Sequence, residues 1–260
     1  MIPEAMEALR SADVIVGYKT YVSLVKDVFP SKVFISKGMR QEVERCRIAI
    51  DTALSGARVA LISSGDAGIY GMAGLVLELC KEDGIPIELE QNNYVPNSPS
   101  EGNNRLKIRI IPGVSALNAA ASILGAPIMH DFASISLSDH LTPWELIEKR
   151  LALASEADFI IVLYNPRSAT RPHVLERAVD VIKKHKPPVT PVGIVWRAMR
   201  EGQKALICSL ESIPFEEVDM HSVVIVGNSQ TYVWNGLMIT PRGYRLRRSE
   251  KDTSELAQEP

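Results

Sequence analysis

Short apolar runs alternate along the chain with segments whose apolar residues recur at helical spacing. Residues 39–55 carry apolar side chains three or four positions apart, which predicts a helix that Gly56 can end in a left-handed conformation. The apolar run 58–62 then predicts a buried strand. The same pattern predicts strands at 13–17, 85–90 and 107–111, and helices at 69–82 and from Ser115 to about Gly125. This alternation indicates a parallel sheet covered by helices.

The second half of the chain continues the alternation. Residues 132–137 alternate as a half-buried strand does, and residues 158–163 form a buried apolar run. Between them, Thr142-Pro-Trp-Glu145 predicts a helix start: Thr142 caps the free amides, Pro143 takes the first helical position, and Glu145 reaches back. A further helix is predicted at 171–185, and strands near 190–196, 204–208 and 222–226.

Two segments interrupt this pattern. Residues 91–105 lack periodicity and are rich in turn formers, which predicts a mobile surface loop. The tail 246–260 is polar, and we expect it to be disordered. With a boundary between about 112 and 130, the sequence predicts an N-terminal α/β domain over 1–115 and a C-terminal α/β domain over 116–245.

Composition excludes several classes of function. The 260 residues include 46% hydrophobic and 23% charged side chains, so we expect a sizeable globular core. The 29 basic and 31 acidic side chains are nearly balanced, which gives no electrostatic footprint for nucleic acid. No apolar run approaches the roughly 18 residues that span a bilayer, and the first residues do not form a signal peptide. The sequence therefore predicts a cytoplasmic protein without a membrane partner.

The three cysteines are too far apart in the sequence to suggest a shared site. Without a C-x-x-C pair, the sequence predicts no zinc or iron–sulfur centre, no metal site and no disulfide framework. Cys46 and Cys208 both lie in apolar surroundings, and we expect them to be buried, inert thiols.

The stretch Ser63-Ser-Gly-Asp-Ala-Gly-Ile-Tyr-Gly71 follows a predicted strand and opens a predicted helix. Open parallel sheets bind ligands at that point, and glycines let the backbone approach a ligand closely. A helix start also favours a carboxylate or phosphate. The alternative is a plain turn in which Asp66 caps the helix. The stretch matches neither the phosphate-cradling nor the dinucleotide-binding glycine pattern.

Other strand ends carry candidate binding residues. After the strand at 107–111 comes Pro112-Gly-Val-Ser115, where Ser115 could cap the next helix or contact a ligand. Tyr164-Asn-Pro-Arg167 ends the run 158–163, and Arg171 follows four residues later. Arg197 and Arg200 follow another strand. Guanidinium groups match substrate carboxylates, although each loop could equally be solvated.

His130 is the candidate acid or base, since histidine titrates near neutral pH and Asp131 lies beside it. A structural role for this pair is the alternative. His140 also follows an aspartate, but its position before the predicted helix indicates a solvated turn.

Several blocks of the sequence resemble the tetrapyrrole methylase family of cobalamin synthesis. The Gly65-Asp66 block is typical of the wider family. Two further blocks, Ser136-Leu-Ser-Asp-His-Leu-Thr-Pro-Trp144 and Val226-Gly-Asn-Ser-Gln-Thr231, resemble the branch that methylates C17 of precorrin-3B or of its cobalt complex. Further resembling segments lie at 12–21, 64–74, 111–119, 130–138, 163–168, 224–232 and 238–244.

The resemblance implies a two-domain α/β fold, with a mostly parallel sheet in the N-terminal domain and a mixed sheet in the C-terminal domain. It further implies a homodimer that binds S-adenosylmethionine in a cleft between its domains and methylates a corrin-ring precursor, with ring contraction. The cofactor residues that it implies are Gly65, Asp66, Ala67, Ile69, Ser115, Ala116, Tyr164, Asn165, Val195, Gly227 and Asn228. Substrate carboxylates would contact Arg167, Arg171 and Arg197, and His130 with Asp131 would transfer a proton during contraction.

The chain departs from the family pattern at two places. Family members carry a strand and a Gly-Pro-Gly-Asp-Pro loop before the equivalent of Pro3, so we expect the first strand to be missing and an edge of the sheet to be exposed. Residues 91–105 also look longer than the family equivalent. The alternatives are another methylase of the same pathway, or a truncated, inactive S-adenosylmethionine-binding protein. Nucleic-acid methylation is a more distant possibility, which the charge balance does not support.

Overall fold

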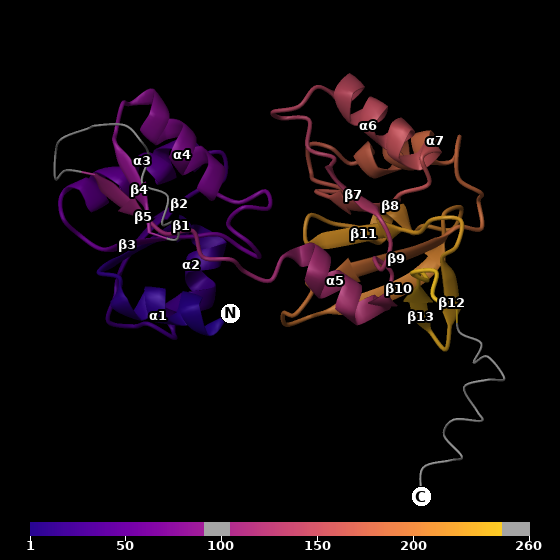
Figure 1. Cartoon of the computed structure of the whole chain (residues 1–260), viewed down its shortest axis with the longest axis horizontal. Helices are drawn as coiled ribbons and strands as arrows, with labels where there is room; N and C mark the ends of the chain where they lie inside the picture. The colour runs from indigo at the N-terminus through magenta and orange to yellow at the C-terminus, as the bar shows by residue number, and fades with distance from the viewer. Residues whose placement is uncertain (91–104, 246–260) are drawn as a thin grey trace, which may run out of the picture. The chain divides into compact units, whose positions relative to one another are not determined.

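The computed structural model describes residues 1–90 and 105–245, and these residues form two compact units (Figure 1). Unit 1 runs from Met1 to Ala116, and unit 2 begins at Leu117. The domain ranges expected from the sequence stay predictions, because a compact unit need not fold alone. The expected loop at 91–105, apart from Arg105, and the expected tail at 246–260 lie outside the described residues.

Unit 1 contains a three-stranded parallel sheet in the order β2-β1-β3, and a separate parallel pair, β4 and β5. The parallel sheet predicted from the sequence is therefore confirmed. The elements of the unit are α1 (Pro3–Ser11), β1 (Val14–Tyr18), α2 (Lys19–Lys26), β2 (Val33–Lys37), α3 (Glu42–Leu54), β3 (Val59–Ile62), α4 (Ala73–Glu82), β4 (Ile87–Leu89) and β5 (Leu106–Ile108).

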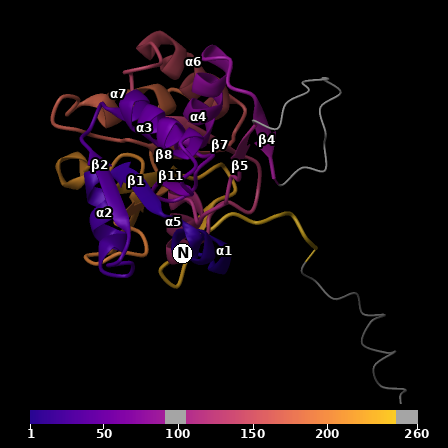
Figure 2. The ribbon, with the colours of Figure 1, turned by 90° about the vertical axis from the view of Figure 1, so that its left-hand side faces the viewer.

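Helices cover both faces of the three-stranded sheet in unit 1 (Figure 2). On one face, Ile15 of β1 packs with α1 and α2 around Phe29. On the other, Cys46 and Ile50 of α3 pack with α4 and with Leu61 of β3. The unit therefore has two small apolar clusters, one on each side of its central strand.

Two details of unit 1 differ from the prediction. The helix expected to begin at residue 69 begins at Ala73, because Tyr70 has a left-handed φ of +54° that an α-helix does not include. The strand β3 is half-buried rather than buried, since the described residues pair it only with β1. Gly56 does end α3 with a φ of +99°, as predicted.

Unit 2 is built on a five-stranded mixed sheet in the order β10-β9-β11-β8-β7, in which only β7 and β8 run parallel. A smaller sheet, β12-β13-β6, lies beside it. The elements are α5 (Ala116–Leu124), β6 (Gly125–Ala126), β7 (Phe132–Ser136), α6 (Trp144–Glu156), β8 (Ile160–Tyr164), α7 (Val174–Ile182), β9 (Pro191–Trp196), β10 (Lys204–Ser209), a 3₁₀ turn (Phe215–Glu217), β11 (Ser222–Val226), β12 (Tyr232–Trp234) and β13 (Leu237–Ile239).

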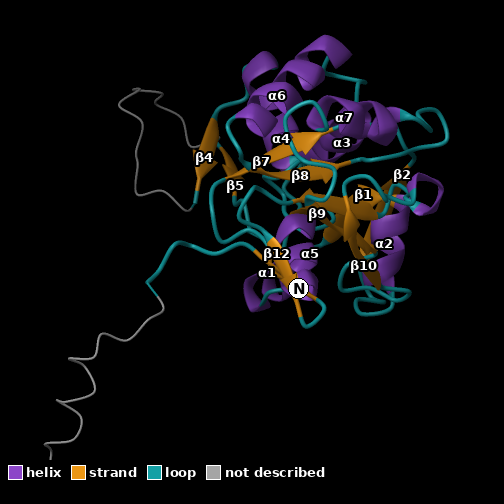
Figure 3. Cartoon of the chain, turned by 90° about the vertical axis from the view of Figure 1, so that its right-hand side faces the viewer, coloured by secondary structure: helices purple, strands orange, loops and turns teal. Residues whose placement is uncertain are grey.

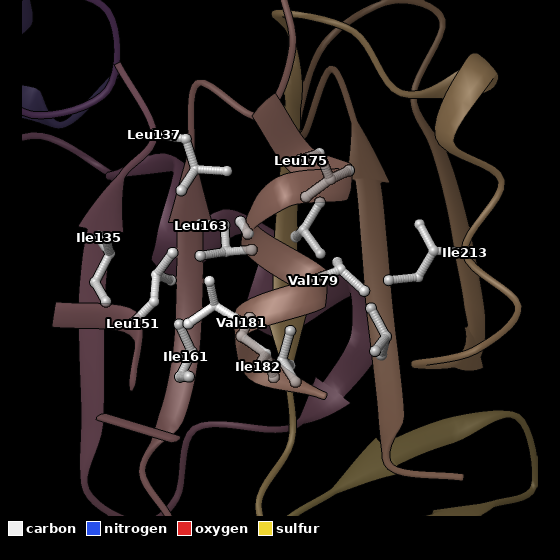
Figure 4. Close-up of a cluster of buried hydrophobic side chains, with 14 of the residues drawn as sticks. Ile135, Leu137, Leu151, Ile161, Leu163, Leu175, Val179, Val181, Ile182 and Ile213 are labelled. Carbon is white, nitrogen blue, oxygen red and sulfur yellow. The ribbon is translucent and has the colours of Figure 1, made fainter. Parts of the chain in front are cut away.

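The main core of unit 2 lies between the five-stranded sheet and the pair α6 and α7 (Figures 3 and 4). Alternate residues of the strands point into it, which is why Val192 and Ile194 of β9 belong to this core while Gly193 does not. On the opposite face α5 approaches the sheet. A Cβ on Gly193 would lie 2.3 Å from Leu124, so only glycine allows this helix to pack so closely.

The prediction that Thr142 caps the start of a helix is wrong. α6 begins at Trp144, Pro143 occupies the N-cap in an extended conformation, and no side chain caps the helix. Thr142 therefore lies one residue too early to cap it. The helix predicted at 171–185 is also shorter, because Ser168 and Arg171 close a turn through backbone hydrogen bonds before it begins.

Strand directions divide the five-stranded sheet of unit 2 into two edges. Tyr164, Ser136 and Trp196 end β8, β7 and β9, so these three residues lie at one edge, which we call the carboxyl edge. The strands β11 and β10 run the other way and begin there. The five residues of β8 separate this edge from the opposite one by roughly 13 Å.

Among the residues that the structure describes, none of the helices combines the length and apolar character that crossing a bilayer requires.

Candidate functional site

Asp66 ties together two loops of unit 1. Its Oδ1 accepts hydrogen bonds from the backbone N–H of Gly68 at 2.8 Å and of Ile69 at 3.1 Å, within its own loop. Its Oδ2 accepts the N–H of Gly113 at 2.8 Å, from the loop that follows β5. The carboxylate therefore joins the two strand-end loops that the sequence singled out.

These contacts change the acidity of Asp66. The N–H of Gly113 and those of Gly68 and Ile69 stabilise the charged form and hold the pKa of the carboxyl below its usual range, although partial burial works against them. Asp66 is consequently ionised at neutral pH. It does not cap α4, whose N-cap is Met72, so the plain helix-cap alternative does not describe this turn.

The two loops of unit 1 are also in direct backbone contact. A Cβ placed on Gly113 would lie 1.9 Å from the carbonyl oxygen of Gly65, so residue 113 must be glycine for the loops to meet. A Cβ on Gly65 would lie 3.6 Å from backbone atoms of Ser115 and Ala116. The structure thus brings together the Gly65–Asp66 and Ser115–Ala116 segments that the sequence assigned to one cofactor.

This loop pair offers a ligand both buried and open groups. Ser115 is buried, while Ile69 and Tyr70 are exposed large side chains. Ala67 contributes its carbonyl oxygen to Ala73, the first residue of α4. Ile69 and Tyr70 are therefore the large side chains of this loop that are open to a ligand.

In unit 2, Tyr164 and Asn165 organise the carboxyl edge. The Tyr164 hydroxyl accepts the N–H of Leu117 at 2.8 Å, which satisfies one of the free amides at the start of α5. Asn165 has a left-handed φ of +54°, and its amide donates to the hydroxyl of Ser136 at 2.9 Å. Both side chains have fixed positions at the strand ends.

Two of the arginines predicted to hold substrate carboxylates are engaged within the protein. Arg167 donates to the carbonyl of Phe215 and pairs with Glu216. Arg171 donates to the carbonyl of Leu137 at 2.9 Å, and its side chain is only 9% exposed. Arg197, by contrast, is an exposed residue just after β9, at the same edge.

The remaining candidates lie elsewhere in unit 2. His130 and Asp131 immediately precede β7, and Gly227 and Asn228 immediately follow β11, so all four lie at the edge opposite Tyr164. The Asp131 N–H donates to Nδ1 of His130 at 2.8 Å. The structure therefore separates the predicted acid–base pair from the predicted arginines, whereas the sequence placed all of them at one site.

Two predicted cofactor residues have internal roles. Val195 is fully buried in β9. Asn228 is buried too, and its side chain accepts from the N–H of Gln230 and the hydroxyl of Thr231, which in turn contacts Thr240. These contacts stabilise the turn after β11.

Sequence reasoning missed Ser136 and His221 as members of the carboxyl edge. His221 precedes β11, and its carbonyl accepts the N–H of Arg197 at 2.9 Å. Hydrophobic periodicity shows where strands are but not which strands are neighbours, so it could not place residues 136, 165 and 221 at one edge. Placing them together requires the order of the strands in the sheet, which the structure supplies.

No group of three or more His, Cys, Asp or Glu side chains that could hold a metal ion occurs within residues 1–90 and 105–245. Cys46 is buried as predicted, and burial raises the pKa of its thiol to about 11. Cys208 is half-buried, which corrects the prediction that it would be buried: it belongs to the edge strand β10, where one side is uncovered.

Comparison with known proteins gives one consistent result. The family model described as Tetrapyrrole (Corrin/Porphyrin) Methylases matches residues 2–90 and 100–214. A probable cobalt-factor III C(17)-methyltransferase of Salmonella typhimurium is 52% identical over 246 residues, which cover 95% of this chain and 94% of the relative. A precorrin-3B C(17)-methyltransferase of a Sinorhizobium species is 34% identical, over 94% of this chain and 91% of the relative.

The solved structures agree with this result. The crystal structure of the methyltransferase CobJ is similar to this chain with a TM-score of 0.81 and 33% sequence identity, and covers 93% of both chains. The two-unit α/β arrangement with a parallel sheet followed by a mixed sheet is thus shared with that enzyme.

Proposed function

The chain belongs to the tetrapyrrole (corrin/porphyrin) methylase family, and from that premise we propose that it transfers a methyl group from S-adenosylmethionine to C17 of a corrin-ring precursor in cobalamin biosynthesis. The identity of 52% over nearly the whole of both chains is the observation that carries this proposal. The precursor is cobalt-factor III or precorrin-3B, and methylation is accompanied by contraction of the ring. Relatives with the first name reach higher identity, 52% against 34%, which favours the cobalt-containing substrate.

The loops of unit 1 fit a cofactor that carries a positive sulfonium and several hydroxyl groups. Asp66 is ionised, and a carboxylate has about four lone-pair sites, of which three accept backbone N–H groups. One acceptor site is left for a hydroxyl of the ligand. We propose that the cofactor makes further backbone and apolar contacts with Gly65, Ala67, Ile69, Ser115 and Ala116.

When bound, S-adenosylmethionine supplies an activated methyl group, so the protein needs no nucleophile of its own. The role of this chain is then to orient the reacting carbon and to exclude water. Tyr164 and Asn165 are the residues of unit 2 that we propose to contact the cofactor. Arg197, which is exposed at the same edge, is suited to a substrate carboxylate.

A methyl-transfer assay tests this proposal. The purified chain and S-adenosylmethionine are incubated with cobalt-factor III in one reaction and with precorrin-3B in a parallel reaction. The products are identified by mass spectrometry and NMR. We expect a product with one added methyl group at C17 and a faster reaction with cobalt-factor III. Calorimetry with S-adenosylmethionine in the same preparation separates an inactive binding protein, which would bind without turnover, from an enzyme.

The assignment of His130 and Asp131 to proton transfer stays a prediction. These two residues lie at the edge opposite Tyr164, and this position does not favour a role in proton transfer. A His130→Ala variant decides the matter: retained methylation with lost ring contraction would support the assignment, and normal rates of both steps would refute it.

We also propose that the chain forms a homodimer. The edge strand β12 exposes Tyr232, Val233 and Trp234, and exposed apolar side chains on an unpaired edge strand typically mark an interaction surface. We expect Trp234→Ser to shift the mass measured by light scattering from dimer to monomer, and Tyr244→Ser, which removes an exposed aromatic outside the sheet, to leave it unchanged. A monomeric wild type would contradict the proposal.

We also propose that the protein is cytoplasmic, and cell fractionation tests this location.

A further inference from the structure

The loop between β7 and α6, residues 137–143, begins at a firmly held residue. Leu137 is fully buried in the core of unit 2, where Figure 4 shows it at one end of the cluster, above Leu163. Its N–H donates to the carbonyl of Tyr164 at 2.9 Å. The loop therefore starts directly beside the end of β8, next to the two residues of unit 2 that we propose to contact the cofactor.

The first half of this loop is held by side chains from neighbouring elements. The Ser136 hydroxyl accepts both the N–H of Ser138 at 3.2 Å and the amide of Asn165 at 2.9 Å. Arg171 donates to the carbonyl of Leu137 at 2.9 Å. The path of the chain is thus determined by contacts with the strand ends at the carboxyl edge.

Arg171 makes a second contact with the loop. Its Nε lies 3.5 Å from the carboxylate of Asp139, which is close enough for a charge pair, yet this buried Nε has no hydrogen-bond partner. With a side chain that is 9% exposed, Arg171 is shielded from a substrate, whereas Asp139 is 38% exposed. The guanidinium holds the loop and is poorly placed to bind a substrate carboxylate directly.

The second half of the loop presents an apolar side chain to solvent. Leu141 is 98% exposed, although the loop is held at both ends: after Pro143, Trp144 lies under the guanidinium of Arg177 at 4.0 Å. Exposed leucines are common on proteins, and Leu153 on α6 is 55% exposed. What distinguishes Leu141 is nearly complete exposure on a loop that starts at Leu137, which is hydrogen-bonded to Tyr164, and that is held at both ends.

We propose that the loop 138–142 is a contact site for the tetrapyrrole, in which Leu141 covers the apolar face of the ring and Arg171, with Asp139, positions the loop. This inference rests on the proposed function. A tetrapyrrole has a large flat apolar ring and acidic side chains at its perimeter, so a single apolar residue on a rigid support is suited to its face. Arg171 is then a positioning residue rather than a carboxylate ligand.

The first experiment compares Leu141→Ser with the matched control Leu153→Ser. We expect Leu141→Ser to raise the KM for cobalt-factor III about tenfold, with kcat, the Kd for S-adenosylmethionine and the Tm unchanged, because only contact with the ring is lost. The control should leave all four quantities unchanged. An unchanged KM in Leu141→Ser would overturn the proposal.

The second experiment separates the two roles of Arg171. If Arg171 positions the loop through Asp139, both Asp139→Asn and Arg171→Lys raise the KM for the tetrapyrrole, and the double variant raises it no further than the more affected single variant. If Arg171 instead binds a substrate carboxylate directly, Asp139→Asn frees the guanidinium and lowers the KM. That result would overturn the positioning role.

Failure of this inference is distinguishable from failure of the proposed function. Cobalt-factor III is titrated into wild type and variants, and binding is followed through the visible absorption of the corrinoid. A wild type that binds cobalt-factor III but does not methylate it would refute the proposed function, while weaker binding by Leu141→Ser alone would still support the contact site. If Leu141→Ser and Leu153→Ser bind cobalt-factor III with the same affinity, the contact site is refuted even in an active enzyme.

Discussion

At the residue scale, the candidate site depends on one carboxylate that has more structural contacts than the sequence suggests. Glycines around Asp66 in the sequence identify a turn at a strand end. They do not show that the carboxylate accepts the N–H of Gly113, 47 residues further along the chain. Such a contact depends on which strands end side by side, and local patterns contain no information about that.

The Asp66→Asn variant tests this contact. An asparagine can accept only some of the backbone hydrogen bonds that the carboxylate accepts, because its amide nitrogen cannot accept an N–H. We therefore expect the variant to lose about 1–3 kcal/mol of unfolding free energy at pH 7. Since folding lowers the pKa of Asp66, the stabilisation is complete above about pH 4 and is lost as the pH falls through the lowered value.

Urea unfolding between pH 7 and pH 3 measures the difference between wild type and Asp66→Asn. Asp180→Asn, which changes an exposed carboxylate on α7, serves as the control and should cost less than about 0.5 kcal/mol. A difference for Asp66→Asn that grows on acidification would contradict the assignment.

Two glycines allow a second test. Gly113→Ala places a methyl group 1.9 Å from the carbonyl of Gly65, so the loops must separate, and we expect the Kd for S-adenosylmethionine to rise at least about tenfold. Gly74→Ala in α4 meets nothing within 4 Å and should stabilise the protein by about 0.4–1 kcal/mol. Calorimetric titration and thermal melting of both variants test the pair, and equal cofactor affinity would contradict the close approach.

At the element scale, periodicity located most strands and helices but misjudged where several begin. The buried strands β8, β9 and β11 were predicted because continuous apolar runs stand out from their surroundings. The helices α1 and α2 and the strands β2, β6, β12 and β13 went unpredicted, since they are short or expose much of their surface. Helix starts were predicted too early at Thr142 and at residue 69.

The start of α6 yields a prediction of its own. Because Pro143 occupies the N-cap and no side chain caps the helix, Thr142→Ala should change the unfolding free energy by less than about 0.5 kcal/mol. A true capping threonine would cost about 1 kcal/mol. Urea unfolding at pH 7 discriminates between the two values. A loss of 1 kcal/mol or more would show that Thr142 caps the helix after all.

At the scale of the whole molecule, the fold class was predictable from the alternation of elements together with the family resemblance. The arrangement of candidate residues was not. Neither signal shows that β11 runs antiparallel to β8, and it is this direction that moves Gly227 and Asn228 to the edge opposite Tyr164. The position of His130 depends on the same strand directions, because it precedes β7, whose far end lies beside Asn165. Its role in proton transfer stays a prediction.

The two units contain different natural probes of unfolding. The three tryptophans, Trp144, Trp196 and Trp234, belong to unit 2, while Cys46 and Cys80 are buried in unit 1. The clusters of unit 1 are small beside the continuous core of unit 2, so we expect unit 1 to unfold at lower denaturant. Pulsed alkylation of Cys46 and Cys80 should therefore precede the change in tryptophan fluorescence, and coincident transitions would show that the units unfold together.

The hydrogen bond from Gly113 to Asp66 also has a consequence for the order of synthesis. A ribosome exposes Asp66 together with Gly68 and Ile69, but the third donor emerges only after 47 further residues. Until then the loop lacks the partner that holds it against the neighbouring strand end. We expect a nascent chain that ends before Gly113 to bind S-adenosylmethionine poorly even if its three-stranded sheet has formed, and binding to appear only when unit 1 is complete.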